Sequence, residues 1–511
     1  MQFCASRFSP RMVIGNLSGW VCPLERAGPF AGCWFFCNLL EGRGMEFNLL
    51  VENWIPVLYT DGRFERVGIR KALSDAHRIR QLAASNPMDN VAVLRFLLAL
   101  LYWCKGNPPD VMIDTSIAPL PTDWLLRLDA NREYFDLLGP EKRFYQDRAA
   151  QRTRPVTDLI QEIPTGNNFW HLRHSTDYFD GLCPPCCAIG LLRLPQFSVS
   201  GLPNLKAGIN GAPPIYVVRW GKSLSDTLRA NWTAHPNFGI PAWVQPDIRP
   251  TPGEDVPLLT GLTVLSRRVW ISDPVGPPGQ CSVCGARKDT LIQTCEFETA
   301  GHLKNDRWGD PHVVYSKASP PTVSKAPDLT KTGKFSMDRP WLELYSQILQ
   351  TGEFLLRDKP ASLFVVAFAT DQAKNIDVWE KHFNPPSGSS FRATAENEIQ
   401  EWQKECRRLE KRTGETIRSE GLGKAAIAAI RPDVENRVSA RAGELLAGDS
   451  NTWSEAATEY RPMMEMLAKS LSPGFTTAAL HRRRQIDRIS LQMGAKPESP
   501  KKPRSNKGTG K

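Results

Sequence analysis

Two pairs of cysteines with the same spacing carry the clearest chemistry in this sequence. Each pair has the form Cys-x-x-Cys, and the second is followed directly by Gly285, as in a tight metal-binding turn. Together the pairs supply four thiolates, the set that a tetrahedral structural zinc ion prefers. Such an ion has no open coordination position, so the pattern predicts a structural staple rather than a catalytic metal. The predicted ligands are Cys183, Cys186, Cys281 and Cys284.

The sequence leaves other interpretations of these cysteines open. They could be two unrelated buried pairs, or one pair could be redox active. Cys187 and Cys295 are further thiols that could replace a ligand. Because the two pairs lie far apart in the sequence, a shared metal would hold remote segments of one large domain together.

The composition is that of a globular chain with a basic surplus. Its 511 residues are 41% hydrophobic and 23% charged, and the formal net charge is +10. A chain of this length is expected to form two or three domains. The surplus fits a solvated surface, but it also fits an acidic polymer such as nucleic acid as a partner. The glycine-rich phosphate loops GxxxxGK[ST] and GxGxxG are absent from the sequence, which argues against a nucleotide-binding enzyme of those classes.

The cysteines and the hydropathy pattern favour a cytoplasmic protein. The chain has 12 Cys but no recognisable secretory leader, and Cys-x-x-Cys pairs suit a reducing compartment. The longest apolar run, residues 91–103, contains Arg95 and is shorter than a bilayer span. The sequence therefore predicts no membrane partner.

Changes of pattern divide the chain into four parts. Residues 1–44 have no clear period and are expected to be a disordered extension, with Met45 as a natural start. Residues 45–386 mix short strands, helices and turns, which is typical of an α+β domain. After a Pro- and Ser-rich linker, residues 391–492 are periodic as in an antiparallel helical bundle. Residues 493–511 form a basic tail that is expected to be disordered. The predicted fold class is thus α+β: a large mixed N-terminal domain with the Cys4 zinc site, followed by a C-terminal helical bundle.

Several elements of the large domain are predicted from turn residues and periodicity. They are a β-hairpin of Leu49–Tyr59 and Phe64–Val67 turned at Asp61-Gly62, a short helix over Gly68–Ala76, a buried helix over Asp89–Cys104 closed by Gly106, an apolar strand over Ser362–Thr370, a polar connection over Asp371–Asn375, and a further ordered segment over Ile376–His382.

Two other groups of residues allow different functions. His302, Asp306 and His312 follow the second cysteine pair and could serve a metal-dependent nuclease, although their spacing matches no ligand pattern. Basic residues gather on two expected helices of the bundle, where they fit either a solvated face with i,i+4 ion pairs or a phosphate-binding face. These possible phosphate contacts are Lys404, Arg407, Arg408, Lys411, Arg482 and Arg483.

The order of several short motifs resembles the CasA family, the large subunit of type I-E CRISPR Cascade. The resemblance covers about residues 46–490, and the order of the motifs is more specific than any one of them. The matching motifs are NLLVENWIPV at 48–57, CAIGL at 187–191, ISDP at 271–274, GQCSVCG at 279–285 and WGDPH at 308–312, before a helical C-terminal region.

The resemblance implies a non-enzymatic subunit of a crRNA-guided surveillance complex. Such a subunit recognises the protospacer-adjacent motif in double-stranded DNA, initiates strand separation for R-loop formation and helps to recruit a helicase-nuclease. The implied partners are the other Cascade subunits, crRNA, the target DNA and that helicase-nuclease. Base pairing to the guide then reads the long sequence, and the protein need read only a short duplex. The alternatives are the large subunit of a different type I CRISPR system and the metal-dependent nuclease.

The resemblance also implies a wedge that splits the duplex beside the motif. Gln372, between Asp371 and Ala373 after the strand that ends at Thr370, occupies the matching place, and Asp371 and Lys374 are predicted to contact DNA beside it. An amide wedge can replace lost base-pairing contacts with its own hydrogen bonds while it disturbs a stacked step. An ordinary polar turn is the other interpretation of these residues.

Two further implied DNA contacts depart from the family pattern. Gln280 stands where the family has a lysine that reaches the minor groove. Its amide can still donate and accept at base edges, but it lacks the charge. Tyr178 lies in residues 175–181, where the family has a glycine-containing loop, and most of those glycines are replaced here. The motif that this chain prefers therefore stays open.

Overall fold

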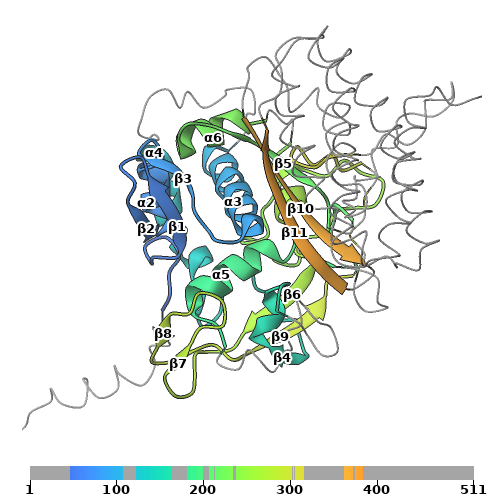
Figure 1. Cartoon of the computed structure of the whole chain (residues 1–511). Helices are drawn as coiled ribbons and strands as arrows, with labels where there is room; N and C mark the ends of the chain where they lie inside the picture. The colour runs from blue at the N-terminus through green and yellow to red at the C-terminus, as the bar shows by residue number, and fades with distance from the viewer. Residues whose placement is uncertain are drawn as a thin grey trace, which may run out of the picture. The chain divides into compact units, whose positions relative to one another are not determined.

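The computed structural model describes residues 46–106, 122–163, 181–199, 206–233, 237–315 and 362–383, apart from positions 212, 302, 304, 306, 372 and 373 (Figure 1). Within these residues the fold is mixed α+β, as expected. The predicted N-terminal extension, helical bundle and basic tail lie outside them, as do Tyr178, Gln372, Lys404, Arg407, Arg408, Lys411, Arg482 and Arg483.

A buried helix, α3 (Pro87–Lys105), lies at the centre of the described core (Figure 1). Asn86 caps its start by accepting a hydrogen bond from the backbone N–H of Met88, and Gly106 ends it at a φ of 67°. Among the described residues, α3 alone is long and apolar enough to cross a membrane by length and composition. However, 89% of that window is buried inside the protein. The predicted helix is confirmed, and α3 is apolar all round because it packs on every side.

The predicted N-terminal hairpin forms one edge of a three-stranded antiparallel sheet. The strands β1 (Ile55–Tyr59), β2 (Phe64–Val67) and β3 (Ile79–Leu82) lie in the order β2-β1-β3. Gly62 makes the hairpin turn at a φ of 85°, which glycine adopts without strain. The first strand begins later than predicted because Asn48 starts a turn, in which its carbonyl accepts from the N–H of Glu52 at 2.9 Å. The short helix α2 (Ile69–Ser74) follows the hairpin.

A second antiparallel sheet contains the two long strands near the end of the described residues. Its order is β11-β10-β5, with β5 (Tyr216–Trp220), β10 (Ser362–Asp371) and β11 (Lys374–Phe383). The polar connection predicted over residues 371–375 is wrong in length. Asp371 pairs with Lys374 after a register shift at residues 369–370, so the ladder continues to the end of the hairpin and only two residues connect the strands.

The remaining elements are a third sheet, a small hairpin and several helices. A third sheet, β4-β9-β6, consists of β4 (Thr153–Pro155), β6 (Arg267–Ile271) and β9 (Thr294–Thr299). A small hairpin consists of β7 (Gly279–Gln280) and β8 (Arg287–Lys288). The helices are α4 (Thr122–Ala130), α5 (Pro184–Arg193), α6 (Leu224–Ala230) and α7 (Leu258–Thr263), with short 3-10 helices at Arg132–Phe135 and Val156–Leu159. Both α5 and α7 pack against α3.

Two buried arginines form ion pairs that join separate segments of this core. Arg95 of α3 makes a two-point ion pair with Asp310, at 2.7 and 2.6 Å, and both side chains are at most 2% exposed. Burial opposes ionisation of Asp310, but the Arg95 charge and the hydrogen bonds to the carboxylate together hold its pKa below the usual value. Asp310 also accepts a hydrogen bond from Asn210 at 2.7 Å. This network anchors the WGDPH motif to the central helix.

The second arginine, Arg193, joins the end of α5 to the start of α3. It pairs with Asp89 at 2.9 Å and with Glu162 at 2.7 Å. Burial raises the pKa of Asp89 to about 6, against the opposing effect of the Arg193 charge. Since α5 also carries the first cysteine pair, this triad fixes that pair relative to the core.

Candidate metal centre and nucleic-acid interface

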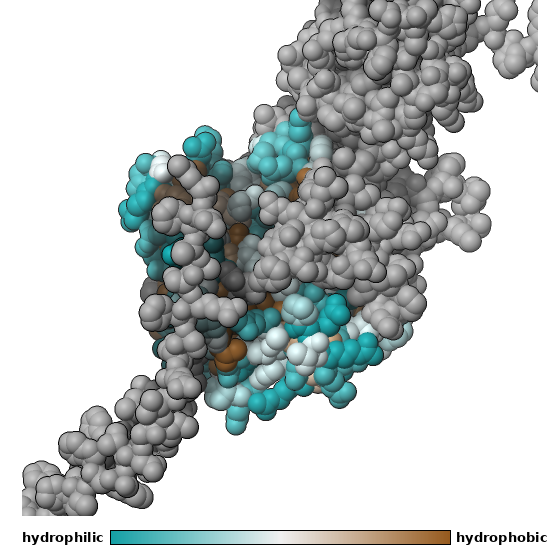
Figure 2. Space-filling model, turned by 60° about the horizontal axis from the view of Figure 1, so that its bottom comes forward, coloured by the Kyte–Doolittle hydropathy of each residue, from teal (hydrophilic) through white to brown (hydrophobic). Residues whose placement is uncertain are grey.

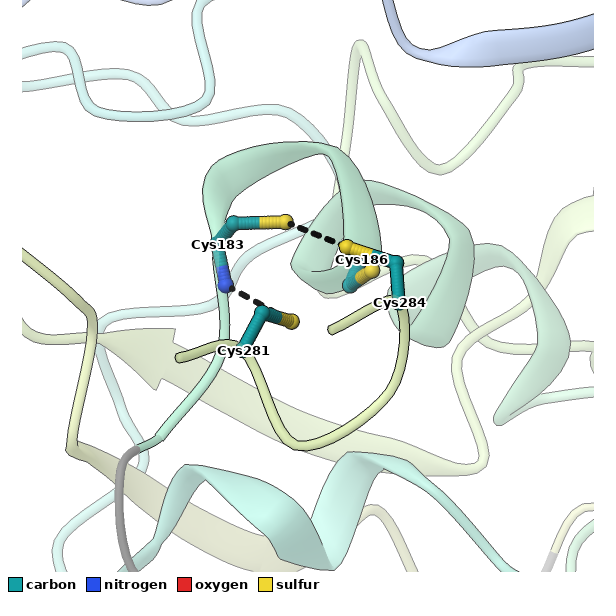
Figure 3. A group of neighbouring side chains, drawn as sticks. All are labelled: Cys183, Cys186, Cys281 and Cys284. Atoms are coloured by element: carbon teal, nitrogen blue, oxygen red, sulfur yellow. Dashed lines mark hydrogen bonds between the residues drawn. The ribbon is translucent and has the colours of Figure 1, made fainter. Parts of the chain in front are cut away.

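The four predicted cysteine ligands meet at one point. Their Sγ atoms all lie within 4.8 Å of one another, and the side chains point toward a shared centre (Figure 3). The Sγ atoms of Cys183 and Cys284 are 3.7 Å apart. Sulfurs bound at about 2.3 Å to a tetrahedral zinc ion are separated by roughly 3.8 Å, so this edge already has the length that zinc requires. Three of the cysteines are buried and Cys284 is half-buried.

Backbone pairing brings the two remote cysteine segments together. Leu182 and Ile292 exchange hydrogen bonds at 2.9 Å, and the N–H of Ser282 donates to the carbonyl of Gly181 at 3.0 Å. Gly181 has a φ of 90°, and a Cβ there would lie 2.3 Å from the carbonyl oxygen of Ile292. Only glycine permits this approach, which aligns the start of α5 with the second cysteine pair.

Local turns then aim the sulfurs inward. Cys183 precedes the first turn of α5, so that Cys186 lies one turn along the same helix. On the other side, the N–H of Gly285 donates to the carbonyl of Cys281 at 2.9 Å, and Gly285 has a φ of 70°. The predicted tight turn at Gly285 is confirmed.

Within the cluster, two thiols share their protons with the other two sulfurs: the pKa values of Cys183 and Cys186 are raised, and those of Cys281 and Cys284 are lowered. The backbone N–H of Cys183 donates to the Sγ of Cys281 at 3.4 Å. Hydrogen bonds from the Cys183 and Cys186 thiols lower the pKa of Cys281 to about 6. The same two neighbours hold the pKa of Cys284 far below its ordinary value. Thiolate is the form that binds metal, and a divalent ion would replace the shared protons. The four-cysteine set is therefore compatible with a structural zinc ion.

The two spare thiols are not part of the cluster. Cys187 points into the core from α5, and burial raises its pKa well above the ordinary value. Cys295 lies on β9, where burial raises its pKa to about 12. Such thiols remain protonated packing residues and do not substitute for a ligand here.

The predicted DNA contact Gln280 lies at the edge of the cysteine cluster. It is the last residue of β7, directly before Cys281, and its side chain is exposed. Its Nε2 lies 3.3 Å from the position of a Cβ on Gly285, so the amide packs over the glycine turn. The cysteine cluster thus holds Gln280 at the surface.

Sequence reasoning missed two basic residues on the same hairpin. Gln280 pairs with Arg287, and Gly279 pairs with Lys288, so Arg287 is the direct cross-strand neighbour of Gln280. Arg287 and Lys288 are both exposed. The sequence did carry a signal for them: Arg287 and Lys288 follow Cys284 closely, and a turn closed at Gly285 brings the chain back beside Gln280.

The other predicted DNA contacts lie on the β10–β11 hairpin and before the first cysteine pair. Asp371 and Lys374 are paired at the end of the β10–β11 hairpin, which agrees with the predicted place of the wedge. Gln372 and Tyr178 lie outside the described residues. Whether any of these residues meets DNA stays a prediction.

His312 is not available as a metal ligand. It is 1% exposed, and its Nδ1 lies 2.9 Å from Nη1 of Arg95. Burial, together with the Arg95 charge, lowers its pKa to about 3. His302 and Asp306 lie outside the described residues. As a buried neutral side chain in the WGDPH network, His312 does not support the nuclease alternative.

The visible surface offers few apolar contacts. Hydrophilic residues cover most of the described surface on the face shown in Figure 2. The segment of the second cysteine pair carries two exposed apolar side chains, Val275 and Val283. The other large exposed apolar side chains among the described residues are Val51, Phe64, Leu126 and Ile240.

Comparison with known proteins identifies the family. Residues 48–493 match the sequence profile of the family described as CRISPR-associated protein Cse1. A CRISPR-associated protein CasA/Cse1 from Thermus thermophilus is 30% identical over 218 residues, which are 40% of this chain and 43% of that protein. The aligned part of the chain thus spans less than half the length of this curated relative.

Solved structures share the fold. A crystal structure of Cse1 from Acidimicrobium ferrooxidans has a TM-score of 0.62 at 19% identity, over 88% of this chain and 98% of that one. A chain from a CRISPR RNA-guided surveillance complex has a TM-score of 0.61 at 16% identity, over 87% and 99% of the two chains. Since the family profile covers most of the sequence, this chain belongs to the Cse1 family. The resemblance to CasA, the large-subunit family of type I-E Cascade, is confirmed.

Proposed function

We propose that this chain is the non-catalytic large subunit of a type I-E-like, crRNA-guided surveillance complex. Its role is to recognise the protospacer-adjacent motif in duplex DNA, to start strand separation and to help recruit the helicase-nuclease. Membership of the Cse1 family supports this role, as does the similar fold of a chain from a CRISPR RNA-guided surveillance complex. Its partners are then the other Cascade subunits, crRNA and target DNA, in the cytoplasm.

The observation that carries the proposal is the position of Gln280 on a hairpin fixed by four cysteines. A zinc ion held by Cys183, Cys186, Cys281 and Cys284 would add rigidity, because these residues join the β7–β8 hairpin to the start of α5. Gln280 can both donate and accept at the minor-groove edges of base pairs. Arg287 and Lys288 add positive charge beside it, which favours the approach of phosphates.

Strand separation is assigned to the β10–β11 hairpin. Each strand has ten residues, and their ladder extends to Asp371 and Lys374. A wedge between base pairs must offset a few kcal/mol of unstacking. We assign the wedge to Gln372 in the two-residue turn between those strands.

Further contacts complete the proposal. Tyr178 approaches the duplex from the segment before the first cysteine pair. The basic residues predicted on the C-terminal helices contact the displaced strand or a neighbouring subunit. This assignment keeps the predicted organisation, with the recognition domain over residues 45–386 and the helical bundle over residues 391–492.

The test uses the complete complex reconstituted with variants of this chain. Gln280→Ala is expected to change which flanking motifs are bound from a randomised duplex library. Gln372→Ala is expected to weaken binding of duplex target more than binding of target already opened by mismatched strands. Arg229→Ala is a suitable control, because this residue pairs with Asp226 on α6, outside both hairpins.

Three results would contradict the proposal. An unchanged motif profile in Gln280→Ala would remove the recognition role of that residue. Equal losses on duplex and opened target in Gln372→Ala would remove the wedge. Cleavage of DNA by this purified chain with Mg²⁺ or Mn²⁺ would contradict the non-catalytic assignment as a whole.

A further inference from the structure

The β7–β8 hairpin is the outer end of a longer arm. This arm, residues 272–293, leaves the third sheet at the end of β6 and returns to it at the start of β9 (Figure 1). Its two legs are paired near the sheet: the N–H of Ser272 donates to the carbonyl of Thr294 at 3.1 Å, and the N–H of Val275 donates to the carbonyl of Leu291 at 3.1 Å. The cysteine cluster holds the outer part of the arm, so contacts at its base are the second influence on its direction.

One side chain, that of Arg143, holds the base of the arm. Among the described residues β6 is an edge strand, so its outer carbonyls need partners from outside the sheet. Arg143 donates to the carbonyl of Ile271, the last residue of β6, and to the carboxylate of Asp273 at 2.7 Å. Its Nε donates to the carbonyl of Gly139 at 2.7 Å, and its Cζ lies 4.6 Å from the ring centre of Trp270. All three nitrogens of the guanidinium therefore have partners, and the side chain is only 7% exposed.

These contacts join the strand to the arm at the ISDP motif, residues 271–274. A planar guanidinium suits this place because its donors have fixed directions, one toward the strand carbonyl and one toward the arm carboxylate. The seven residues from Asp273 to Gln280 span at most roughly 23–25 Å. Over that length, a rotation of about 5° at the base moves the tip by about 2 Å, whereas a contact to a base edge has to be placed to within about 0.5 Å.

We propose that Arg143 is a positioning residue for recognition of the protospacer-adjacent motif. It holds the base of the arm through Ile271 and Asp273, so that Gln280 meets base edges in one orientation. This inference rests on the proposed function, in which Gln280 reads the motif. It adds that specificity depends on a side chain that touches no DNA.

The test uses the reconstituted complex and two duplexes, one with the motif that the wild-type complex selects and one with that motif scrambled. We expect Arg143→Met to lower the ratio of the two affinities by about 2–30-fold, the size of effect that residues without ligand contact have on a distant site. Arg148→Met is the matched control. Arg148 also lies over the Trp270 ring, at 5.0 Å, but it is exposed and donates to the carbonyl of Pro140. This variant removes the same charge and should leave the ratio unchanged.

A second variant removes the acceptor on the arm. The carboxylate of Asp273 is 69% exposed, so the core of Asp273→Ala should fold as in wild type. We expect this variant to lower the same ratio, and we expect the double variant with Arg143→Met to lose no more than Arg143→Met alone, because both changes break one contact. If Arg143→Met does not fold, the ratio in Asp273→Ala decides.

Two outcomes would overturn the role of Arg143. One is a wild-type ratio in Arg143→Met and Asp273→Ala. The other is an equal loss of affinity for both duplexes, which a merely structural role would produce. Gln280→Ala in the same assay separates this inference from the proposed function. If Gln280→Ala lowers the ratio and the other two variants do not, only Arg143 loses its role; if Gln280→Ala leaves the ratio unchanged, the recognition role of Gln280 fails and the inference fails with it.

Discussion

The buried ion pair between Arg95 and Asp310 gives the strongest prediction about stability. Arg95→Met removes the guanidinium but keeps most of the apolar stem. Asp310 is fully buried, so its carboxylate would lose its compensating charge while it still accepts from Asn210. Breaking one side of a buried pair typically costs about 3–5 kcal/mol. We expect a loss of this size in the unfolding free energy of the core.

The assay is a double-mutant cycle followed by urea denaturation and tryptophan fluorescence. Asp310→Asn removes the second charge and keeps an oxygen acceptor for Asn210, so the double variant should recover part of the loss. A coupling energy of roughly 1–3 kcal/mol is expected for residues in direct contact. Arg70→Met is the control: its pair with Asp129 is exposed on both sides and should contribute less than about 1 kcal/mol.

Additive losses would refute this reasoning. If the double variant lost as much stability as the two single variants together, the two charges would not depend on each other. The WGDPH motif would then be fixed to α3 by its other contacts, such as the hydrogen bond from Trp308 Nε1 to Asn210 at 2.7 Å.

Three other changes test the site and its surroundings. Gly181→Ala should lower zinc retention, because the added Cβ would lie 2.3 Å from the carbonyl oxygen of Ile292. Gly253→Ala is the control: this residue also has a positive φ, but the space around it is open, so the variant should lose only roughly 1–2 kcal/mol of stability through backbone strain. Cys281→Ser should lower both the zinc content measured by elemental analysis and the melting temperature, and unchanged zinc would exclude Cys281 as a ligand. The unfolding free energy should fall as the pH drops from 6.5 toward 3, because His312 takes up a proton in the unfolded chain at a higher pH than in the folded one. His312→Gln should make this fall less steep in urea titrations at several pH values. An equally steep fall in the variant would contradict the lowered pKa of His312.

The sequence predicted the parts of the fold that depend on local signals. Asp61-Gly62 marks a hairpin turn by the backbone freedom of glycine, and the apolar residues of α3 end at Gly106. The four cysteines were found because zinc requires thiolates in this spacing. These features need no knowledge of tertiary packing.

Features that depend on contacts between remote segments were not found in advance. The β10–β11 ladder extends through polar residues to Asp371 and Lys374, and polarity alone suggested a loop there. His312 looked like a candidate ligand until its burial beside Arg95 was known.

The most direct test of the proposed function is a structure of the assembled complex on target DNA that contains the matching motif. The account predicts a metal ion among the four cysteines and Gln280 within hydrogen-bonding distance of base edges in the minor groove, with Arg287 facing the phosphate backbone. A β7–β8 hairpin that faces away from the duplex, with other residues reading the motif, would contradict it.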